Sequence, residues 1–176
     1  VLVGGATFRN WPHPSLPDGA DRPRLAGRPW NVVVTRTLKV PVTREFLAEP
    51  GIRPLFLTRA GSVPDAFPAE VETYEGPGND LPVAWMLDAL RRRGVQRLLI
   101  EAGGDLLFLF FAAGAIDEVF VTLCPLLIGG DAPSLADGAG FTWPQMRHLR
   151  LLESEVAGDE IFLSYQTVPP AAPVVS

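Results

Sequence analysis

The sequence predicts an α/β domain of three layers, in which helices cover both faces of a largely parallel central sheet. Short apolar strands alternate with helical patterns along most of the chain, and this alternation is typical of β–α–β units. Two alternating segments, 149–156 and 160–166, surround turn residues at 157–159 and predict a closing antiparallel hairpin. The 176 residues are enough for one full core, so we expect a single domain over residues 1–167 and a disordered tail at 168–176.

The individual elements follow from β-branched runs, helical periodicity and chain breakers. WNVVVT is a β-branched strand, and Asn79 or Asp80 is placed to cap a helix that Gly94 ends. Proline, aspartate and arginine without an apolar period predict a long surface loop at 10–29. In chain order, the pattern predicts strands at 1–3, 30–35, 54–58, 71–74, 96–100 and 118–124, a helical turn at 43–48, and helices at 79–93 and 106–113.

Charge and composition argue against several classes of partner. The net charge of −5 at pH 7 argues against a general binder of nucleic acid or anionic membranes. The longest apolar stretch, 106–116, is shorter than the ~20 residues that span a bilayer, and we find no secretory signal, so a cytoplasmic protein is expected. His13 and His148 lack an acidic or cysteine partner at metal-ligand spacing, and no metal is expected. The single cysteine, Cys124, excludes an intrachain disulfide and is expected to pack inside an apolar strand.

Two glycine pairs interrupt the pattern, each between a predicted strand and the segment that follows it. They are Gly4-Gly5 and Gly103-Gly104. In a parallel sheet the carboxyl ends of the strands open onto the ligand crevice, glycine lets the backbone approach a ligand, and a helix N-terminus offers free N–H groups. The pairs therefore predict a phosphate-bearing ligand. The alternative is a pair of tight turns without a ligand, since neither matches GxGxxG or a P-loop.

Glu101 ends the apolar run RLLIE just before the second glycine pair. A carboxylate at the end of a buried strand is costly unless it is hydrogen-bonded or used. We predict that Glu101 has a function, with structural hydrogen bonding as the alternative.

Several motifs together resemble the reductase domain of riboflavin biosynthesis. They are EAGGDL from Glu101, AGAIDE from Ala113 and CPLLIGG from Cys124, together with the opening VLVGGATFR and the strand WNVVVTR. The resemblance covers roughly residues 1–166. It implies a dihydrofolate-reductase-like fold, a homodimer, and NADPH as the cofactor that reduces the ribosyl group of a ribosylaminopyrimidine 5′-phosphate to ribityl.

The resemblance also implies a role for individual residues. Glu101 would face the reacting centre near the nicotinamide and would bind the pyrimidine nucleotide-like substrate together with Arg9 and Asn10. Arg36 would accommodate the 2′-phosphate that distinguishes NADPH from NADH, whereas Arg59, which also follows a threonine at a strand end, is expected to extend into solvent. The cofactor-binding residues implied by position are Gly4, Gly5, Ala6, Thr7, Thr35, Arg36, Gly103, Gly104, Asp105 and Leu106.

Two departures from the family keep other hypotheses open. Residues 10–14 read NWPHP where the family has an acidic A-D-D-P segment that helps to hold the substrate. The family's opening strand is not among these residues, and a deaminase domain ahead of Val1 is left open. The alternatives are a dihydrofolate-reductase-like reductase of another heterocycle and a nucleotide-binding homologue without catalysis. The apolar stretch 119–127 and the closing hairpin are expected to form the homodimer interface.

Overall fold

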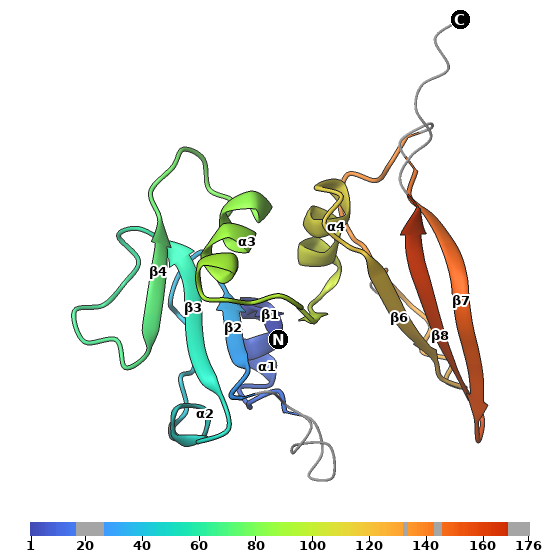
Figure 1. Ribbon diagram of the computed structural model, residues 1–176, viewed down its shortest axis with the longest axis horizontal. Helices are drawn as coiled ribbons and strands as arrows, with labels where there is room; N and C mark the ends of the chain where they lie inside the picture. Colours follow the sequence, from blue (N-terminus) through green and yellow to red (C-terminus); the bar gives the residue numbers. More distant parts are fainter. Residues whose placement is uncertain (17–26, 132–133, 143–145, 169–176) are drawn as a thin grey trace, which may run out of the picture. The chain divides into compact units, whose positions relative to one another are not determined.

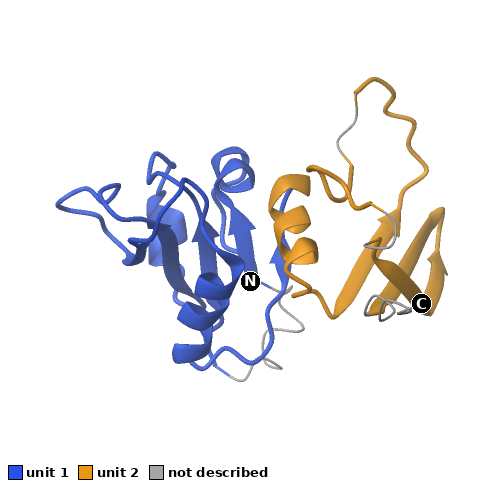
Figure 2. Ribbon diagram, turned by 90° about the horizontal axis from the view of Figure 1, so that it is seen from above, with its two compact units in different colours: residues 1–103 blue, residues 104–176 orange. Residues whose placement is uncertain are grey.

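The computed structural model describes residues 1–16, 27–131, 134–142 and 146–168, and it divides the chain into two units (Figure 2). Unit 1 is Val1–Gly103 and unit 2 is Gly104–Ser176. A single domain over 1–167 stays a prediction, and residues 169–176 of the expected tail lie outside the described residues. No helix among the described residues is long and apolar enough to cross a membrane.

Unit 1 is built on a five-stranded sheet in which all neighbouring strands are parallel (Figure 1). The strand order is β4-β3-β2-β1-β5. Successive strands are joined through helices or longer crossovers, as parallel pairing requires. The elements are β1 (Leu2–Gly4), α1 (Gly5–Asn10), β2 (Trp30–Val34), α2 (Arg44–Ala48), β3 (Arg53–Arg59), β4 (Glu70–Tyr74), α3 (Val83–Arg92) and β5 (Ile100–Glu101).

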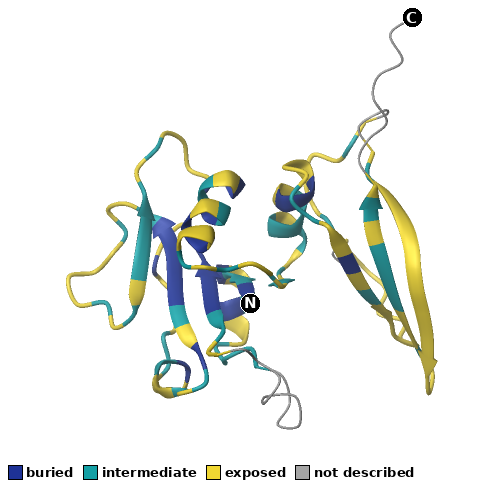
Figure 3. Cartoon of the chain, in the orientation of Figure 1, coloured by how far each residue is buried: buried dark blue, intermediate teal, exposed yellow. Residues whose placement is uncertain are grey.

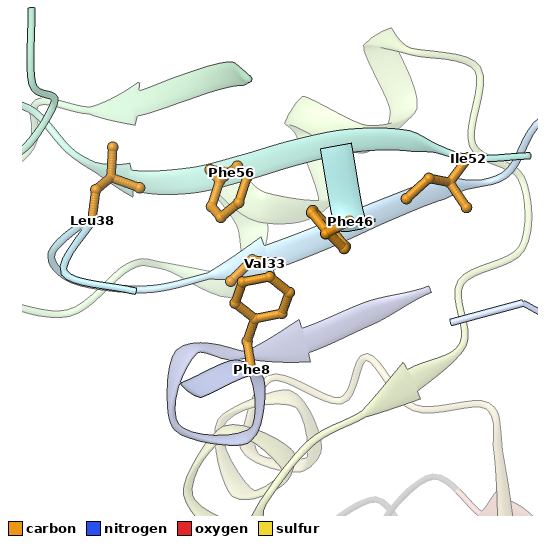
Figure 4. Packing of buried hydrophobic residues seen from close by; sticks show 6 residues of the cluster. All are labelled: Phe8, Val33, Leu38, Phe46, Ile52 and Phe56. Atoms are coloured by element: carbon orange, nitrogen blue, oxygen red, sulfur yellow. The ribbon is translucent and has the colours of Figure 1, made fainter. Parts of the chain in front are cut away.

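The core of unit 1 lies on both faces of β2 and β3, whose side chains are mostly buried (Figure 3). On one face, an aromatic cluster joins the sheet to α1 and α2 (Figure 4). Phe8, Phe46 and Phe56 meet there edge to face, with ring centroids 4.8–6.1 Å apart. Because side chains alternate along a strand, Val32 faces the opposite side, where it lines the same hollow as Leu90 of α3.

The predicted helix of residues 79–93 begins later than expected. Neither Asn79 nor Asp80 caps α3, since its N-cap is Pro82, which makes no side-chain cap hydrogen bond. Its predicted end is confirmed, because Gly94 follows the helix with a φ of +79°, a conformation that favours glycine. The predicted strand at 96–100 is also too long, because β5 contains only Ile100–Glu101.

Unit 2 contains α4 (Gly104–Ala112) and a three-stranded antiparallel sheet in the order β6-β8-β7. Its strands are β6 (Glu118–Leu123), β7 (His148–Ala157) and β8 (Glu160–Val168). The predicted hairpin is confirmed, with Ala157 paired to Glu160 across a two-residue turn. Within unit 2, its strand β8 also pairs with β6 in antiparallel register.

Cys124 is not packed inside a strand as expected. It follows the last residue of β6 and is exposed. A hydrogen bond to the carboxylate of Glu160 raises the pKa of the Cys124 thiol. A raised pKa disfavours the thiolate, which is the reactive form of cysteine.

Candidate functional site

The first glycine turn joins β1 to α1 at the carboxyl end of the parallel sheet. β1 ends at Gly4, and α1 begins at Gly5. A Cβ atom on Gly5 would lie 2.8 Å from Oγ1 and 2.9 Å from Cβ of Thr35, just beyond β2. Glycine is therefore required at position 5 so that the first turn of α1 can pack against the end of β2.

The second glycine turn contains two glycines with different surroundings. A Cβ atom on Gly104 would lie 2.7–2.9 Å from backbone and side-chain atoms of Ser134 and Asp137 in unit 2. A Cβ atom on Gly103 would meet no atom within 4 Å, and Gly103 does not have a positive φ. Packing therefore accounts for the glycine at 104, whereas the described residues give no packing or conformational reason for the glycine at 103.

Glu101 lies at the carboxyl end of β5, the edge strand beside β1. In the parallel register Glu101 pairs with Val3, so the segment after Glu101 and the Gly4-Gly5 turn leave neighbouring strands at the same edge of the sheet. The side chain is exposed, which means that the desolvation cost that singled out Glu101 in the sequence does not apply. Its Oε2 accepts a hydrogen bond of 3.2 Å from the Ser15 hydroxyl.

Residues 11–16, here called the 11–16 segment, are fixed to the sheet and to α2 by several polar contacts. The amide of Asn31 bonds to the backbone of Ser15 at both of its polar atoms. The hydroxyl of Thr43 donates to the carbonyl of Pro12 at 3.2 Å. His13 Nδ1 lies 3.3 Å from Oε1 of Glu45, so His13 does have an acidic neighbour, although one far away in the sequence.

The two Thr-Arg pairs lie at the carboxyl ends of β2 and β3. Thr35 is buried, and its hydroxyl donates to the carbonyl of Thr37 at 2.7 Å. The Arg36 side chain is 71% exposed, and its Nη1 lies 3.8 Å from a carboxylate oxygen of Asp80. Arg59 does not extend into solvent as expected, because it is partly buried, donates to the Gly76 carbonyl at 2.8 Å and lies over the Tyr74 ring.

The remaining predicted site residues lie on helices α1 and α4. Ala6, Arg9 and Asn10 are exposed on α1 and Thr7 is partly buried. Asp105 is exposed and Leu106 is partly buried on α4, in unit 2. Unit 1 thus brings together Glu101, Gly103, the first glycine turn and the Thr-Arg pairs at one end of its sheet, whereas Gly104, Asp105 and Leu106 belong to the other unit.

Sequence reasoning missed three residues of this region: His13, Ser15 and Asn31. A detectable signal was present for Asn31, because an amide inside the β-branched run WNVVVT is costly unless it is hydrogen-bonded. Its partner Ser15 lies in a loop 16 residues earlier, and no local pattern identifies it.

Two of the hollows in unit 1 lie against its parallel sheet. One of about 10 Å³, enough for about one water, lies under the 11–16 segment and is lined by His13, Ser15, Asn31 and Val33, among others. A wider hollow of about 170 Å³ lies at the amino ends of the strands, beside Trp30 and Arg97, away from the candidate site.

Comparison with known sequences places these residues in a family context. The sequence matches the family described as RibD C-terminal domain over residues 1–163. It is 30% identical over 172 residues to the riboflavin biosynthesis protein RibD of Bacillus amyloliquefaciens, covering 93% of this chain and 45% of that protein. It is 29% identical over 118 residues to the 2,5-diamino-6-ribosylamino-4(3H)-pyrimidinone 5′-phosphate reductase of Archaeoglobus fulgidus, covering 64% of this chain and 53% of that protein. The chain thus spans about half the length of these relatives.

Comparison with solved structures supports the fold class. RibD of Acinetobacter baumannii superimposes with a TM-score of 0.73 at 19% identity, covering 95% of this chain and 46% of that chain. A pyrimidine reductase-like protein of Corynebacterium diphtheriae also gives a TM-score of 0.73, at 20% identity, covering 95% of this chain and 75% of that chain. The predicted dihydrofolate-reductase-like α/β fold is confirmed by this likeness.

Proposed function

Because the chain belongs to the family of the RibD C-terminal domain, we propose that it is an NADPH-dependent reductase of the riboflavin-pathway type. Its substrate would be a ribosylaminopyrimidine 5′-phosphate, whose ribosyl group is reduced to ribityl. The proposal extends to this chain what the name of the archaeal relative says of that protein.

The observation that carries the proposal is the position of Glu101. Its exposed carboxylate lies at the carboxyl end of β5, directly beside β1, from which the Gly4-Gly5 turn leaves the sheet. Gly103 follows two residues later, with open space where a side chain would be. An acidic group thus lies near Gly103, where a phosphate-bearing ligand can approach the backbone closely.

The residues at this end of the sheet fit a dinucleotide in two respects. Gly103 leaves room for close approach of a ligand to the backbone. Within the part of the chain that the structure describes, the exposed guanidinium of Arg36 has no strong partner that would keep it from a 2′-phosphate. Asp80 opposes this fit, because its carboxylate lies 3.8 Å from Arg36, but an ion pair between two exposed groups is worth little. Glu101 supplies a negative charge for the reacting end of the substrate.

NADPH supplies a hydride when bound, and the chain supplies binding and electrostatics. Reduction of an open-chain imine at C1′ of the ribosyl group passes through a cationic or hydrogen-bonded nitrogen. The carboxylate of Glu101 would orient the substrate and stabilise that charge. Arg9 and Asn10, both exposed on α1, would help to bind the substrate.

The substitution Glu101→Gln tests the role of the carboxylate, because it keeps the shape and removes the charge. We expect turnover of NADPH with the ribosylaminopyrimidine phosphate to fall sharply, by about 10²-fold or more, while the Kd for NADPH changes little. The matched control is Glu118→Gln, the same change at an exposed carboxylate in β6 of unit 2. Unchanged turnover in Glu101→Gln would show that Glu101 is structural and would remove the proposed mechanism.

A second candidate, reduction of another heterocycle, is favoured by one observation. The NWPHP stretch presents Trp11, 69% exposed, in the place of the family's acidic segment; the Trp11 ring lies 4.7 Å from the His13 ring, centroid to centroid, at a tilt of 52°. An aromatic surface binds a flat ring by stacking, whereas carboxylates recognise hydroxyl and amine groups. Turnover of NADPH with a pteridine and none with the ribosylaminopyrimidine phosphate would favour this candidate, and NADPH binding without turnover of either would indicate a non-catalytic homologue.

We also propose that the protein is a homodimer whose interface includes β6 and the closing hairpin. In the antiparallel register, Leu123, Ile161 and Val156 lie side by side on one face, and all three are exposed. Exposed apolar surface of this kind marks an interaction site. Light scattering at micromolar concentration is expected to give the mass of a dimer, and a monomer there would contradict the proposal.

A further inference from the structure

Ser15 connects a buried asparagine to Glu101. Asn31, in β2, is 4% exposed, and its Oδ1 accepts from the backbone N–H of Ser15 at 2.7 Å while its Nδ2 donates to the backbone carbonyl of Ser15 at 3.1 Å. Both polar atoms of a buried amide are thereby satisfied by one residue of a loop. The hydroxyl of the same Ser15 then donates to Oε2 of Glu101 at 3.2 Å.

The strand register explains how these three residues meet. Asn31 and Val33 lie on the same face of β2, since side chains alternate along a strand. Val33 pairs with Val3 of β1, and Val3 pairs with Glu101 of β5. The 11–16 segment therefore crosses over β1 from β2 to β5, and the backbone of Ser15 is fixed at the point where its hydroxyl reaches the carboxylate.

From this geometry we infer that Ser15 is a positioning residue, which holds the Glu101 carboxylate in the orientation in which it meets the substrate, and that Asn31 fixes Ser15 for this purpose. The inference rests on the proposed function, in which Glu101 acts on the substrate. An exposed glutamate has several rotamers of similar energy, so one charge-assisted hydrogen bond from a fixed donor is enough to favour one of them.

The hydroxyl itself is not what anchors the loop. The 11–16 segment is also fixed through the backbone atoms of Ser15 bonded to Asn31, by Thr43 on the Pro12 carbonyl, and by Glu45 on His13. Removing only the hydroxyl leaves these contacts in place. The effect of the Ser15 hydroxyl on turnover is therefore separable from the fold of the segment.

The experiment is a double-mutant cycle of Ser15→Ala and Glu101→Ala, with Ser15→Thr as the conservative variant. Ser15→Ala is expected to lower kcat about tenfold, the effect of one hydrogen bond to a charged group, with the Kd for NADPH unchanged. Ser15→Thr keeps a hydroxyl and is expected to restore most of kcat. In the Glu101→Ala background, Ser15→Ala is expected to cause no further loss.

Two outcomes would overturn the inference: an unchanged kcat in Ser15→Ala, or the same tenfold loss when Glu101 is already absent. Failure of the proposed function is a different result, seen as intact turnover in Glu101→Ala or no turnover in the unmodified protein. In that case the unmodified protein, Ser15→Ala, Glu101→Ala and the double variant are each unfolded in urea. If the changes in unfolding midpoint of the two single variants do not add up to the change in the double variant, the Ser15–Glu101 contact is supported as the one that fixes the carboxylate. If they do add up, the inference is overturned.

Discussion

Two neighbouring parallel strands of unit 1 finish with the same dipeptide, Thr35-Arg36 after β2 and Thr58-Arg59 at the end of β3. In the first pair the threonine is hydrogen-bonded and the arginine is exposed. In the second pair the threonine is fully buried and its hydroxyl has no partner among the described residues, while the arginine is held by Gly76 and Tyr74. An identical sequence at equivalent strand ends thus presents a cation to solvent at one strand and uses it for packing at the next.

The difference teaches that strand position alone does not identify a ligand-binding arginine. Nη2 of Arg59 donates a hydrogen bond to the Gly76 carbonyl, and its Nη1 is buried without a partner among the residues that the structure describes. Among the described residues, the Arg36 guanidinium contacts the Asp80 carboxylate at 3.8 Å and no other charged group. A phosphate is bound by a guanidinium that can reach it without breaking other contacts, so Arg36 is the better candidate for the 2′-phosphate.

The largest expected effect comes from Arg36→Ala. We expect the unmodified protein to prefer NADPH over NADH, and this substitution to reduce the preference by ~1.5–3 kcal/mol, the usual worth of a charge-assisted hydrogen bond. Dissociation constants for both cofactors, measured by fluorescence titration, give the preference directly. Equal affinity of the unmodified protein for the two cofactors would contradict the assignment of Arg36.

Asp80→Asn is the matched control for Arg36→Ala, and it is expected to change the preference for NADPH in the opposite direction. It removes the carboxylate that lies beside Arg36 and leaves the guanidinium in place. The preference for NADPH is expected to rise by up to ~1 kcal/mol, because exposed ion pairs are weak. A fall in the preference would indicate that Asp80 orients Arg36 for binding.

Arg59→Ala is expected to act on stability and not on the choice of cofactor. The substitution removes a hydrogen bond to the Gly76 carbonyl and a contact with the Tyr74 ring, whose centroid lies 5.6 Å from Cζ of Arg59. Together these contacts are worth about 1–2 kcal/mol of unfolding free energy. Urea unfolding measures the loss, and the ratio of the two cofactor dissociation constants should stay within a factor of two. A large change in that ratio would remove the distinction between the two arginines.

The sequence predicts the fold well where hydrophobic pattern and breakers agree. WNVVVT became β2, Gly94 ended α3, and the turn at Gly158 closed the hairpin. It predicted the ends of some elements less well. The N-cap of α3 is Pro82 and not the better capping residue Asn79 or Asp80. Where a strand at 96–100 was expected, β5 contains only Ile100–Glu101.

The candidate site was less predictable than the fold because its chemistry depends on partners distant in sequence. Glycine is required at positions 5 and 104 by neighbours that lie 30 or more residues away, whereas Gly103 has no such neighbour within 4 Å. The sequence pattern Gly-Gly does not distinguish a glycine required by packing from one with open space around it. Ser15 and Glu101 are 86 residues apart, and no local pattern predicts their hydrogen bond.

Substitutions of the two threonines are expected to have smaller effects than those of the two arginines, and they change only a hydroxyl group. Thr35→Val removes the hydroxyl that donates to the Thr37 carbonyl at 2.7 Å, while the side-chain volume is nearly unchanged. The unfolding free energy is expected to fall by about 1 kcal/mol, the net worth of one hydrogen bond. A urea titration resolves this change, and an unchanged midpoint would show that water replaces the lost bond.

Thr58→Val is expected to have the smallest effect and the opposite sign. Thr58 is 0% exposed, it lies on the same face of β3 as Phe56, and its Oγ1 has no hydrogen-bond partner among the described residues. A buried hydroxyl without a partner already bears its desolvation cost in the folded state, and valine has almost the same shape without that cost. The unfolding free energy should therefore stay within ~0.5 kcal/mol of the unmodified value or rise by up to ~1 kcal/mol, and the Kd for NADPH should not change. If Thr58→Val instead lost as much stability as Thr35→Val, the hydroxyl of Thr58 would have a partner, and the two strand ends would be equivalent at the threonine as well as in sequence.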